Sequence, residues 1–255
     1  MKTATRASEA PEVLNRAVHV WLCRLEPASI ASLARSSRTV LSEDERERAD
    51  RIRRESQRQM FEVAHALVRQ GLSVYADVDE TDWSFDTNQW GRPEIAGPAH
   101  APPFTFSLSH THGLVACAIS VGIECGVDVE NFARGGQPLR VARRVLSERE
   151  FADLERQPVE TKLDRLLEYW TLKEAYLKAR GVGMSVAMQD VSFALDERGI
   201  RLVAVDSEAT SGPDAWSFTS ARPTPSHMLA LALGPPDGPS RTVMMREGLP
   251  RDPAG

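Results

Sequence analysis

Two acidic side chains occur at a spacing that could hold a cation. In Gly126-Val127-Asp128-Val129-Glu130, the alternation of a β-strand would place both valines on one face and both carboxylates on the other. The two carboxylates would then lie about 6.6 to 7 Å apart. Like charges at this separation favour a cation between them. The alternative interpretation is a solvent-facing strand end without a ligand.

A third carboxylate lies on the apolar side of a predicted helix. The segment 161–180 has the spacing of an amphipathic helix, and Glu174 falls inside its apolar stripe. An unpaired charge there would cost several kcal/mol, so the group must be neutralised, paired or bound to metal. Lys178, one turn later, offers an intrahelical salt bridge as the alternative. Together with Asp128 and Glu130, Glu174 completes a set of hard oxygen ligands that suits magnesium.

Composition indicates a cytoplasmic globular protein. The 255 residues include 36 acidic and 31 basic side chains, a balance that argues against a general nucleic-acid binder. The three cysteines lack metal-ligand spacing and indicate a reducing compartment. The apolar stretch 114–123 is too short to span a membrane, and no secretory signal follows the first residues.

The pattern of strand, helix and strand hairpin occurs twice along the chain. A strand is predicted at 18–22, a helical region with one interruption from Ser42 to Tyr75, and hairpins at 104–121 and 215–233. The second half supplies the strand 126–130 and the helix 161–180. We therefore predict an N-terminal subdomain over 13–125 and a C-terminal subdomain over 126–235, flanked by a disordered N-terminus, 1–12, and a flexible tail, 236–255.

Four ordered motifs resemble those of the 4′-phosphopantetheinyl transferases. Residues 170–183 look like the signature W-x-x-K-E-A-x-x-K-x-x-G-x-G, and 126–130 is similar to G-[IV]-D-[IV]-E. Residues 106–110 are similar to the family segment F-N-[IL]-S-H-S, and 90–93 contain its G-[KR]-P. Ser107 and Thr111 depart from the usual asparagine and serine. The length and the two-half pattern look like the monomeric surfactin-synthetase-activating, or Sfp-like, type.

The resemblance implies a fold and an activity. The fold would be α+β, with two similar subdomains related by a pseudo-twofold axis, each with a small, mainly antiparallel sheet packed against a long helix. The activity would be magnesium-dependent transfer of 4′-phosphopantetheine from coenzyme A to a serine of an apo acyl- or peptidyl-carrier protein. Such carriers serve polyketide and nonribosomal peptide biosynthesis. The enzyme would be a monomer with no nucleic-acid or membrane partner.

The resemblance also implies the metal ligands and the catalytic groups. Asp128, Glu130 and Glu174 would hold Mg²⁺, or Mn²⁺ in its place, against the coenzyme A diphosphate. Lys178 would contact that diphosphate and take part in catalysis. Glu150 would be the general base, with Glu148 or a metal-bound water as its rivals.

Further residues would bind the remainder of coenzyme A, including its 3′-phosphate. They are Arg92, Ser109, His110, Lys173, Lys178 and Arg58. The segment Val141–Leu146, with Arg140, Arg143 and Arg144, is a hypothetical docking surface for an acidic carrier, and its alternative interpretation is a plain amphipathic helix.

Two other functions agree with the same residues. One is a magnesium-dependent pyrophosphate hydrolase acting on coenzyme A or a nucleotide, in which water replaces the carrier serine. The other is a non-catalytic module that binds coenzyme A or docks a carrier, in which the acidic residues form only structural salt bridges.

Overall fold

The computed structural model describes residues 10–132, 138–205, 212–235 and 241–250. These residues form two compact units. Unit 1 contains 10–87, 93–122 and 241–250, and unit 2 contains 88–92, 123–132, 138–205 and 212–235. Residues 88–92 therefore belong to unit 2 although both flanking segments belong to unit 1.

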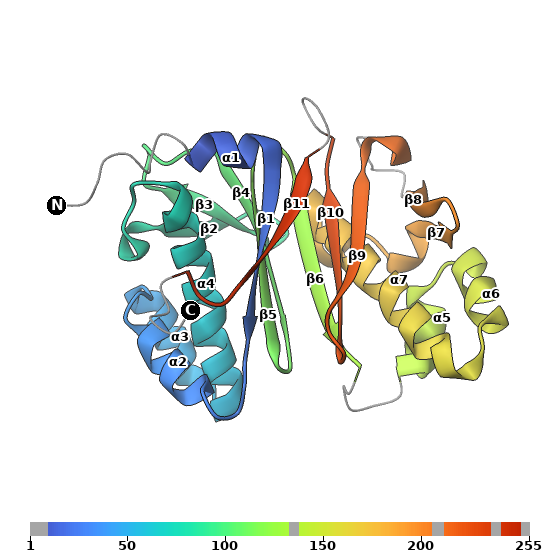
Figure 1. Ribbon diagram of the computed structural model, residues 1–255, viewed down its shortest axis with the longest axis horizontal. Helices are drawn as coiled ribbons and strands as arrows, with labels where there is room; N and C mark the ends of the chain where they lie inside the picture. Colours follow the sequence, from blue (N-terminus) through green and yellow to red (C-terminus); the bar gives the residue numbers. More distant parts are fainter. Residues whose placement is uncertain (1–9, 133–137, 206–211, 236–240, 251–255) are drawn as a thin grey trace. The chain divides into compact units, whose positions relative to one another are not determined.

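Unit 1 is a four-stranded sheet with a long helix on it (Figure 1). The strand order is β11 (Thr242–Glu247), β1 (Ala17–Arg24), β5 (Leu114–Val121) and β4 (Phe104–Thr111). The β1–β5 and β5–β4 pairs are antiparallel, whereas β11 runs parallel to β1. Helix α4 (Glu55–Tyr75) packs against β4 and β5, and its apolar residues fill the core with those of the sheet.

Shorter elements complete unit 1. They are α1 (Ala10–Arg16), α2 (Ile30–Arg38), α3 (Glu43–Arg51), and the hairpin strands β2 (Ser84–Thr87) and β3 (Pro93–Gly97). Helix α3 begins with a capping box, in which the Ser42 hydroxyl accepts from the Glu45 N–H and the Glu45 carboxylate accepts from the Ser42 N–H. The box satisfies two otherwise unpaired donors and explains why the helix begins at this point.

Unit 2 is a three-stranded antiparallel sheet covered by its own long helix (Figure 1). The order is β6 (Cys125–Asn131), β10 (His227–Leu233) and β9 (Ser217–Thr224). Helix α7 (Val159–Arg180) packs along β6 and β10. The remaining elements are α5 (Ala142–Val145), α6 (Glu148–Arg156) and the hairpin of β7 (Ser192–Asp196) with β8 (Gly199–Ala204).

The predicted fold class is confirmed: each unit is a small, mainly antiparallel sheet with a long helix against it. The predicted strands, hairpins and long helices are present, and the interruption between α3 and α4 lies at 52–54. The subdomain boundaries and the pseudo-twofold axis stay predictions. No helix in the described part of the chain is long and apolar enough to cross a membrane.

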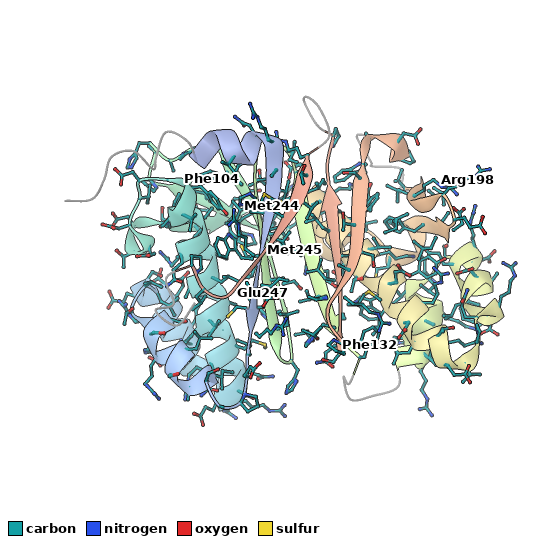
Figure 2. All side chains as sticks on the ribbon, in the orientation of Figure 1. Phe104, Phe132, Arg198, Met244, Met245 and Glu247 are labelled. Carbon is teal, nitrogen blue, oxygen red and sulfur yellow. The ribbon has the colours of Figure 1, made fainter. Side chains whose placement is uncertain are left out.

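Part of the segment predicted as a flexible tail, 236–255, forms a strand. Residues 242–247 form β11, and Met244 and Met245 lie on it (Figure 2). An ion pair of 3.0 Å between Glu247 Oε1 and Arg24 Nη2 also joins β11 to β1. At the other end, α1 begins at Ala10, inside the predicted disordered segment 1–12, and residues 1–9 lie outside the described part.

Candidate active site

A glycine allows β6 and α7 to approach with their backbones in contact. A Cβ atom added to Gly126 would lie 2.0 Å from the Ala175 oxygen and 2.5 Å from the Ala179 nitrogen, so only glycine fits. Side chains alternate along a strand, so Asp128 and Glu130 point to the same side of β6 as this missing Cβ. The strand therefore directs both carboxylates toward α7.

The first of these carboxylates pairs with a lysine of the helix. Lys178 Nζ lies 2.6 Å from Asp128 Oδ1 and donates to the Val127 oxygen at 3.2 Å. Asp128 and Glu130 are 5% and 9% exposed, which excludes the interpretation of this strand as a solvent-facing end. The Lys178 side chain remains 31% exposed, so one end of the ion pair meets solvent.

Glu174 shares the electrostatic environment of the other two carboxylates. Burial raises its pKa, the charges of Asp128 and Glu130 raise it further, and the charge of Lys178 opposes them. The Glu174 carboxylate makes no hydrogen bond or ion pair with any described residue. The salt bridge to Lys178 considered from the sequence is therefore replaced by the pair between Lys178 and Asp128.

These three carboxylates, called here the carboxylate cluster, have a chemistry that fits a hard divalent cation. When ionised, the cluster would carry three negative charges, one each on Asp128, Glu130 and Glu174. Lys178 supplies one positive charge beside them. Oxygen donors of this kind are the ligands that Mg²⁺ prefers. Within the described ranges, however, no three acidic, histidine or cysteine side chains are gathered closely enough to hold a metal ion.

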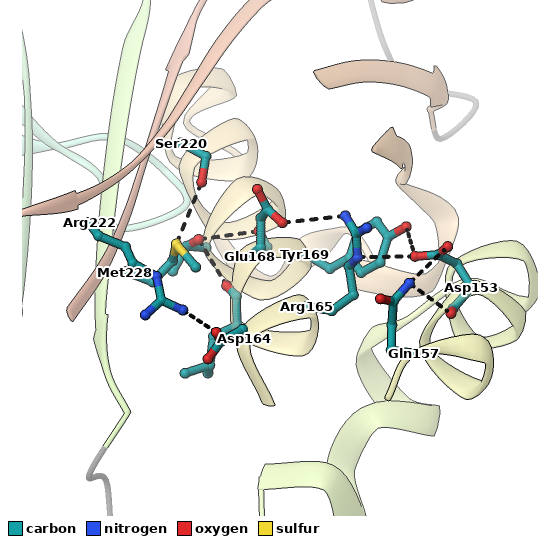
Figure 3. Close-up of polar contacts among 11 residues, drawn as sticks. Asp153, Gln157, Asp164, Arg165, Glu168, Tyr169, Ser220, Arg222 and Met228 are labelled. Carbon is teal, nitrogen blue, oxygen red and sulfur yellow. Dashed lines mark hydrogen bonds and ion pairs between the residues drawn. The ribbon is translucent and has the colours of Figure 1, made fainter. Parts of the chain in front are cut away.

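Helix α7 is also fixed at its N-terminal half by polar contacts (Figure 3). The Tyr169 hydroxyl donates to Asp153 Oδ2 on α6 at 2.9 Å, and Arg165 Nε lies 3.3 Å from the same oxygen. Arg222 of β9 forms an ion pair with Asp164. These contacts hold the helix between α6 and the sheet and limit how far Glu174 can shift.

Glu150 occupies a structural position. It is the third residue of α6 and 0% exposed, and it closes a capping box with Ser147. Its Oε2 accepts from the Ser147 N–H at 2.8 Å and lies 2.5 Å from Lys173 Nζ, and its Oε1 accepts from the Phe193 N–H at 2.8 Å. Both oxygens are thus used inside the protein, which argues against the general-base role predicted for this residue.

Lys173 has the complementary structural position. It is 0% exposed, and besides Glu150 its ammonium contacts the Val145 oxygen at 2.8 Å and the Met188 oxygen at 2.9 Å. All three N–H donors of the ammonium therefore have a partner. Burial lowers the pKa of Lys173, and the charge of Glu150 opposes that shift. This geometry leaves no donor for coenzyme A, in contrast to the predicted binding role.

Glu148 lies at a groove in unit 2, in contrast to its buried neighbour Glu150. The groove has a volume of about 610 Å³, and Arg143, Leu146, Phe151 and Gln189 also line it. Glu148 is exposed, and the Arg143 guanidinium stacks 4.0 Å from the centre of the Phe151 ring. The groove thus combines a cationic group, an apolar floor and a carboxylate.

Three of the predicted binding residues lie in unit 1. Ser109 and His110 are in the last part of β4 and not in a turn, because the strand continues to Thr111. Ser109 is buried and His110 exposed. Arg58 is half-buried in the first turns of α4, and its charge lowers the pKa of Asp50 as a minor cause after the hydrogen bond from Arg38. Ser109, His110 and Arg58 thus belong to a different unit from the carboxylate cluster.

Arg92 lies in unit 2 and contacts the protein itself. Its Nη1 donates to Glu124 Oε2 and to the Ala179 oxygen, both at 2.8 Å. The neighbouring Asn88 Nδ2 donates to the Gly181 oxygen at 3.0 Å. Neither Asn88 nor Glu124 was predicted as a site residue. The glycines of the 170–183 motif are the sequence signal that could have indicated a close approach of another segment there.

The chain is similar to known proteins along most of its length. Residues 124–232 match the family model of the 4′-phosphopantetheinyl transferase superfamily. The chain is 28% identical to the 4′-phosphopantetheinyl transferase HetI of Nostoc sp. over 87% of its own length and 89% of the relative. It is 25% identical to the 4′-phosphopantetheinyl transferase Sfp of Bacillus subtilis over 80% and 87%, respectively.

Solved structures give a more distant similarity. A holo-[acyl-carrier-protein] synthase from Thermotoga maritima aligns with a TM-score of 0.38 and 23% identity, over 44% of this chain and 63% of the other. A synthase from Bacillus anthracis has the same TM-score with 20% identity, over 44% and 96%.

The motifs in family order, the matching family model and the similarity to Sfp and HetI over most of the chain define the class. The protein is a member of the 4′-phosphopantetheinyl transferase superfamily, of the Sfp-like type. It is an enzyme, a transferase of the holo-carrier-protein synthase class.

Proposed function

We propose that this enzyme moves the 4′-phosphopantetheine group of coenzyme A onto a serine of an apo acyl- or peptidyl-carrier protein. The serine oxygen attacks the pantetheine-side phosphorus and forms a new P–O bond. The bond from that phosphorus to the diphosphate bridging oxygen breaks, and adenosine 3′,5′-bisphosphate leaves. The observation that carries the proposal is the carboxylate cluster beside Lys178, a site suited to a diphosphate with a divalent cation.

Asp128, Glu130 and Glu174 would hold Mg²⁺, with Mn²⁺ as a substitute. When bound, the ion supplies positive charge against the nonbridging oxygens of the diphosphate. The support for this assignment is the donor set itself: two buried carboxylates on the side of β6 that faces α7, and a third carboxylate, Glu174, on α7.

Lys178 would contact the diphosphate. Its side chain is partly exposed, and its ammonium contacts the Val127 oxygen as well as the Asp128 carboxylate. A lysine fixed in this way orients the phosphate as a point charge and stabilises the charge of the transition state.

The resemblance assigns the 3′-phosphate of coenzyme A to Ser109, His110 and Arg58, and the proposal keeps this assignment. Their side chains carry a hydroxyl group, an imidazole and a guanidinium, which are groups that bind phosphate.

The carrier serine must lose a proton as it attacks. We assign this proton to Glu148, because Glu148 is exposed at the groove whereas both oxygens of Glu150 are bonded inside the protein. Glu150 and Lys173 then form a buried ion pair that joins α6 to α7 and maintains the shape of the site.

The groove beside Glu148 would receive the carrier. Arg140, Arg143 and Arg144 are exposed along its segment, and Leu146 and Phe151 give it an apolar part. An acidic carrier surface with an apolar centre would match both features. Substitution of Arg143 and Arg144 by glutamate should raise the KM for the carrier and leave the KM for coenzyme A unchanged.

One experiment tests the function and its two rivals. The enzyme is incubated with coenzyme A, Mg²⁺ and apo-carriers, and the carrier mass is followed against the variants Glu174→Gln and Glu160→Gln. Glu160 is an exposed residue of the same helix and serves as the control. We expect the phosphopantetheine mass to be added by the parent and by Glu160→Gln only. Phosphopantetheine released without carrier would indicate a hydrolase, and no product at all would indicate a binding module.

A further inference from the structure

At the C-terminal end of α7, backbone hydrogen bonds satisfy some of the last carbonyl groups and leave others to partners outside the helix. Gly181 takes a left-handed conformation with φ of 66°. Its N–H donates to the Lys178 oxygen at 3.1 Å, and the Val182 N–H donates to the Leu177 oxygen at 3.4 Å. This Schellman arrangement satisfies two carbonyls of the last turn. The Ala179 and Gly181 oxygens are not part of it.

The loop 88–92 supplies the partners for these two oxygens. Arg92 Nη1 donates to the Ala179 oxygen at 2.8 Å, and Asn88 Nδ2 donates to the Gly181 oxygen at 3.0 Å. Glu124 holds the same Arg92 nitrogen at 2.8 Å. A guanidinium at the C-terminal end of a helix also interacts favourably with the helix dipole. The Arg92 side chain is only 15% exposed, which is consistent with a role inside the protein.

Asn88 also fixes the shape of the loop. Its Oδ1 accepts from the Trp90 N–H at 2.9 Å and from the Arg92 N–H at 3.0 Å, and its own N–H donates to the Arg92 oxygen at 2.9 Å. Gly91, with φ of 84°, permits the tight reversal. The loop is thus a preformed unit that presents Arg92 and Asn88 together.

The loop explains why glycine occurs at the last two glycine positions of the 170–183 motif. A Cβ at Gly181 would lie 3.0 Å from Arg92 Cδ, and one at Gly183 would lie 3.0 Å from the Trp90 oxygen. Both residues also have positive φ. The helix end and the loop therefore pack closely at both Gly181 and Gly183.

We propose that Arg92 and Asn88 are positioning residues that clamp the C-terminal end of α7 and thereby hold Lys178 and Glu174 in place against β6. Lys178 directly precedes Ala179, whose oxygen Arg92 binds, so a loosened helix end would move the lysine first. This role replaces the contact with the 3′-phosphate that the sequence predicted for Arg92. Its kinetic readout rests on the proposed transferase function.

The two roles of Arg92 differ in a measurable way. Coenzyme A and dephospho-coenzyme A differ only in the 3′-phosphate. A residue that binds this group affects the KM for coenzyme A alone, whereas a residue that positions Lys178 lowers kcat with both substrates. Arg92→Ala, Asn88→Ala and Glu124→Gln are therefore compared for both substrates, with Arg198→Ala as the control. Arg198 is exposed in the turn between β7 and β8 (Figure 2).

Hydrogen exchange gives a second measurement that does not depend on activity. We expect the amides of Gly181 and Val182 to exchange at least about tenfold faster in Arg92→Ala and Asn88→Ala, because each loses a hydrogen bond that holds the helix end. We expect kcat to fall by one common factor for both substrates. Unchanged exchange, or a loss confined to the KM for coenzyme A, would overturn the proposal. Faster exchange in a chain that transfers nothing to any carrier would instead refute the proposed function and leave the clamp supported.

Discussion

Replacing Gly126 by alanine is the most informative perturbation of the site. The new methyl group would lie 2.0 Å and 2.5 Å from two backbone atoms of α7, Ala175 O and Ala179 N. Ordinary contact begins near 3.4 Å, so the helix would have to retreat by about 1.4 Å at Ala175. Backbone atoms cannot rotate away as the end of a flexible side chain can.

Two effects of known size follow from that shift. Overpacking of this kind costs about 1–3 kcal/mol, and the upper end applies here because two backbone contacts are violated. For a chain of this size, about 3 kcal/mol corresponds to a fall in Tm of roughly 6–12 °C. Misplacing catalytic groups by about 1 Å lowers the rate on the order of 100-fold.

The assay combines thermal unfolding with phosphopantetheine transfer at a temperature where the variant is folded. Gly212→Ala is the matched control, since an added Cβ there meets nothing within 4 Å. The control should keep both the parent Tm and the parent kcat. A Gly126→Ala enzyme with parent stability and parent kcat would refute the view that close packing of β6 on α7 builds the site.

Three further predictions concern titratable groups. Glu174→Gln should lower the transfer rate on the order of 10³-fold. With a chelator present, the same variant should have a higher free energy of unfolding than the parent at neutral pH. The reason is that the pKa of Glu174 is raised in the folded state, so its ionised carboxylate destabilises the fold as the pH rises through that pKa. Lys173→Met should lower the free energy of unfolding in urea by about 3–5 kcal/mol, since it leaves the Glu150 charge buried without its partner, while kcat of the folded enzyme changes little. Acid should weaken the fold through His19, which is fully buried; burial and the charge of Arg246 lower its pKa to about 4, from 6.5. The stability present above pH 6.5 should fall by about 3 kcal/mol between pH 6.5 and 4, and His19→Gln should flatten this part of the pH profile of Tm.

Local sequence rules predicted the central part of the site. Strand alternation placed Asp128 and Glu130 on one face, and the helical repeat placed Glu174 on the packed side of its helix. Both rules depend only on neighbouring residues, so they needed no knowledge of the tertiary fold. The structure adds the reason why the two elements meet, which is the missing side chain of Gly126.

Other assignments depended on contacts that sequence spacing does not encode. The role of Glu150 is set by Lys173 and the Phe193 N–H, which are distant in the chain. A local signal did exist, because Ser147 and Glu150 have the spacing of a capping box. The strand β11 was missed because its pairing with β1 joins opposite ends of the sequence.

Metal binding tests the central claim most directly. Mn²⁺ is titrated into the enzyme with coenzyme A present, and the bound ion is counted in the parent and in Asp128→Asn, Glu130→Gln and Glu174→Gln. We predict one ion per chain in the parent and a large loss of affinity in each of the three variants. Parent-like affinity in any one of them would contradict the shared site.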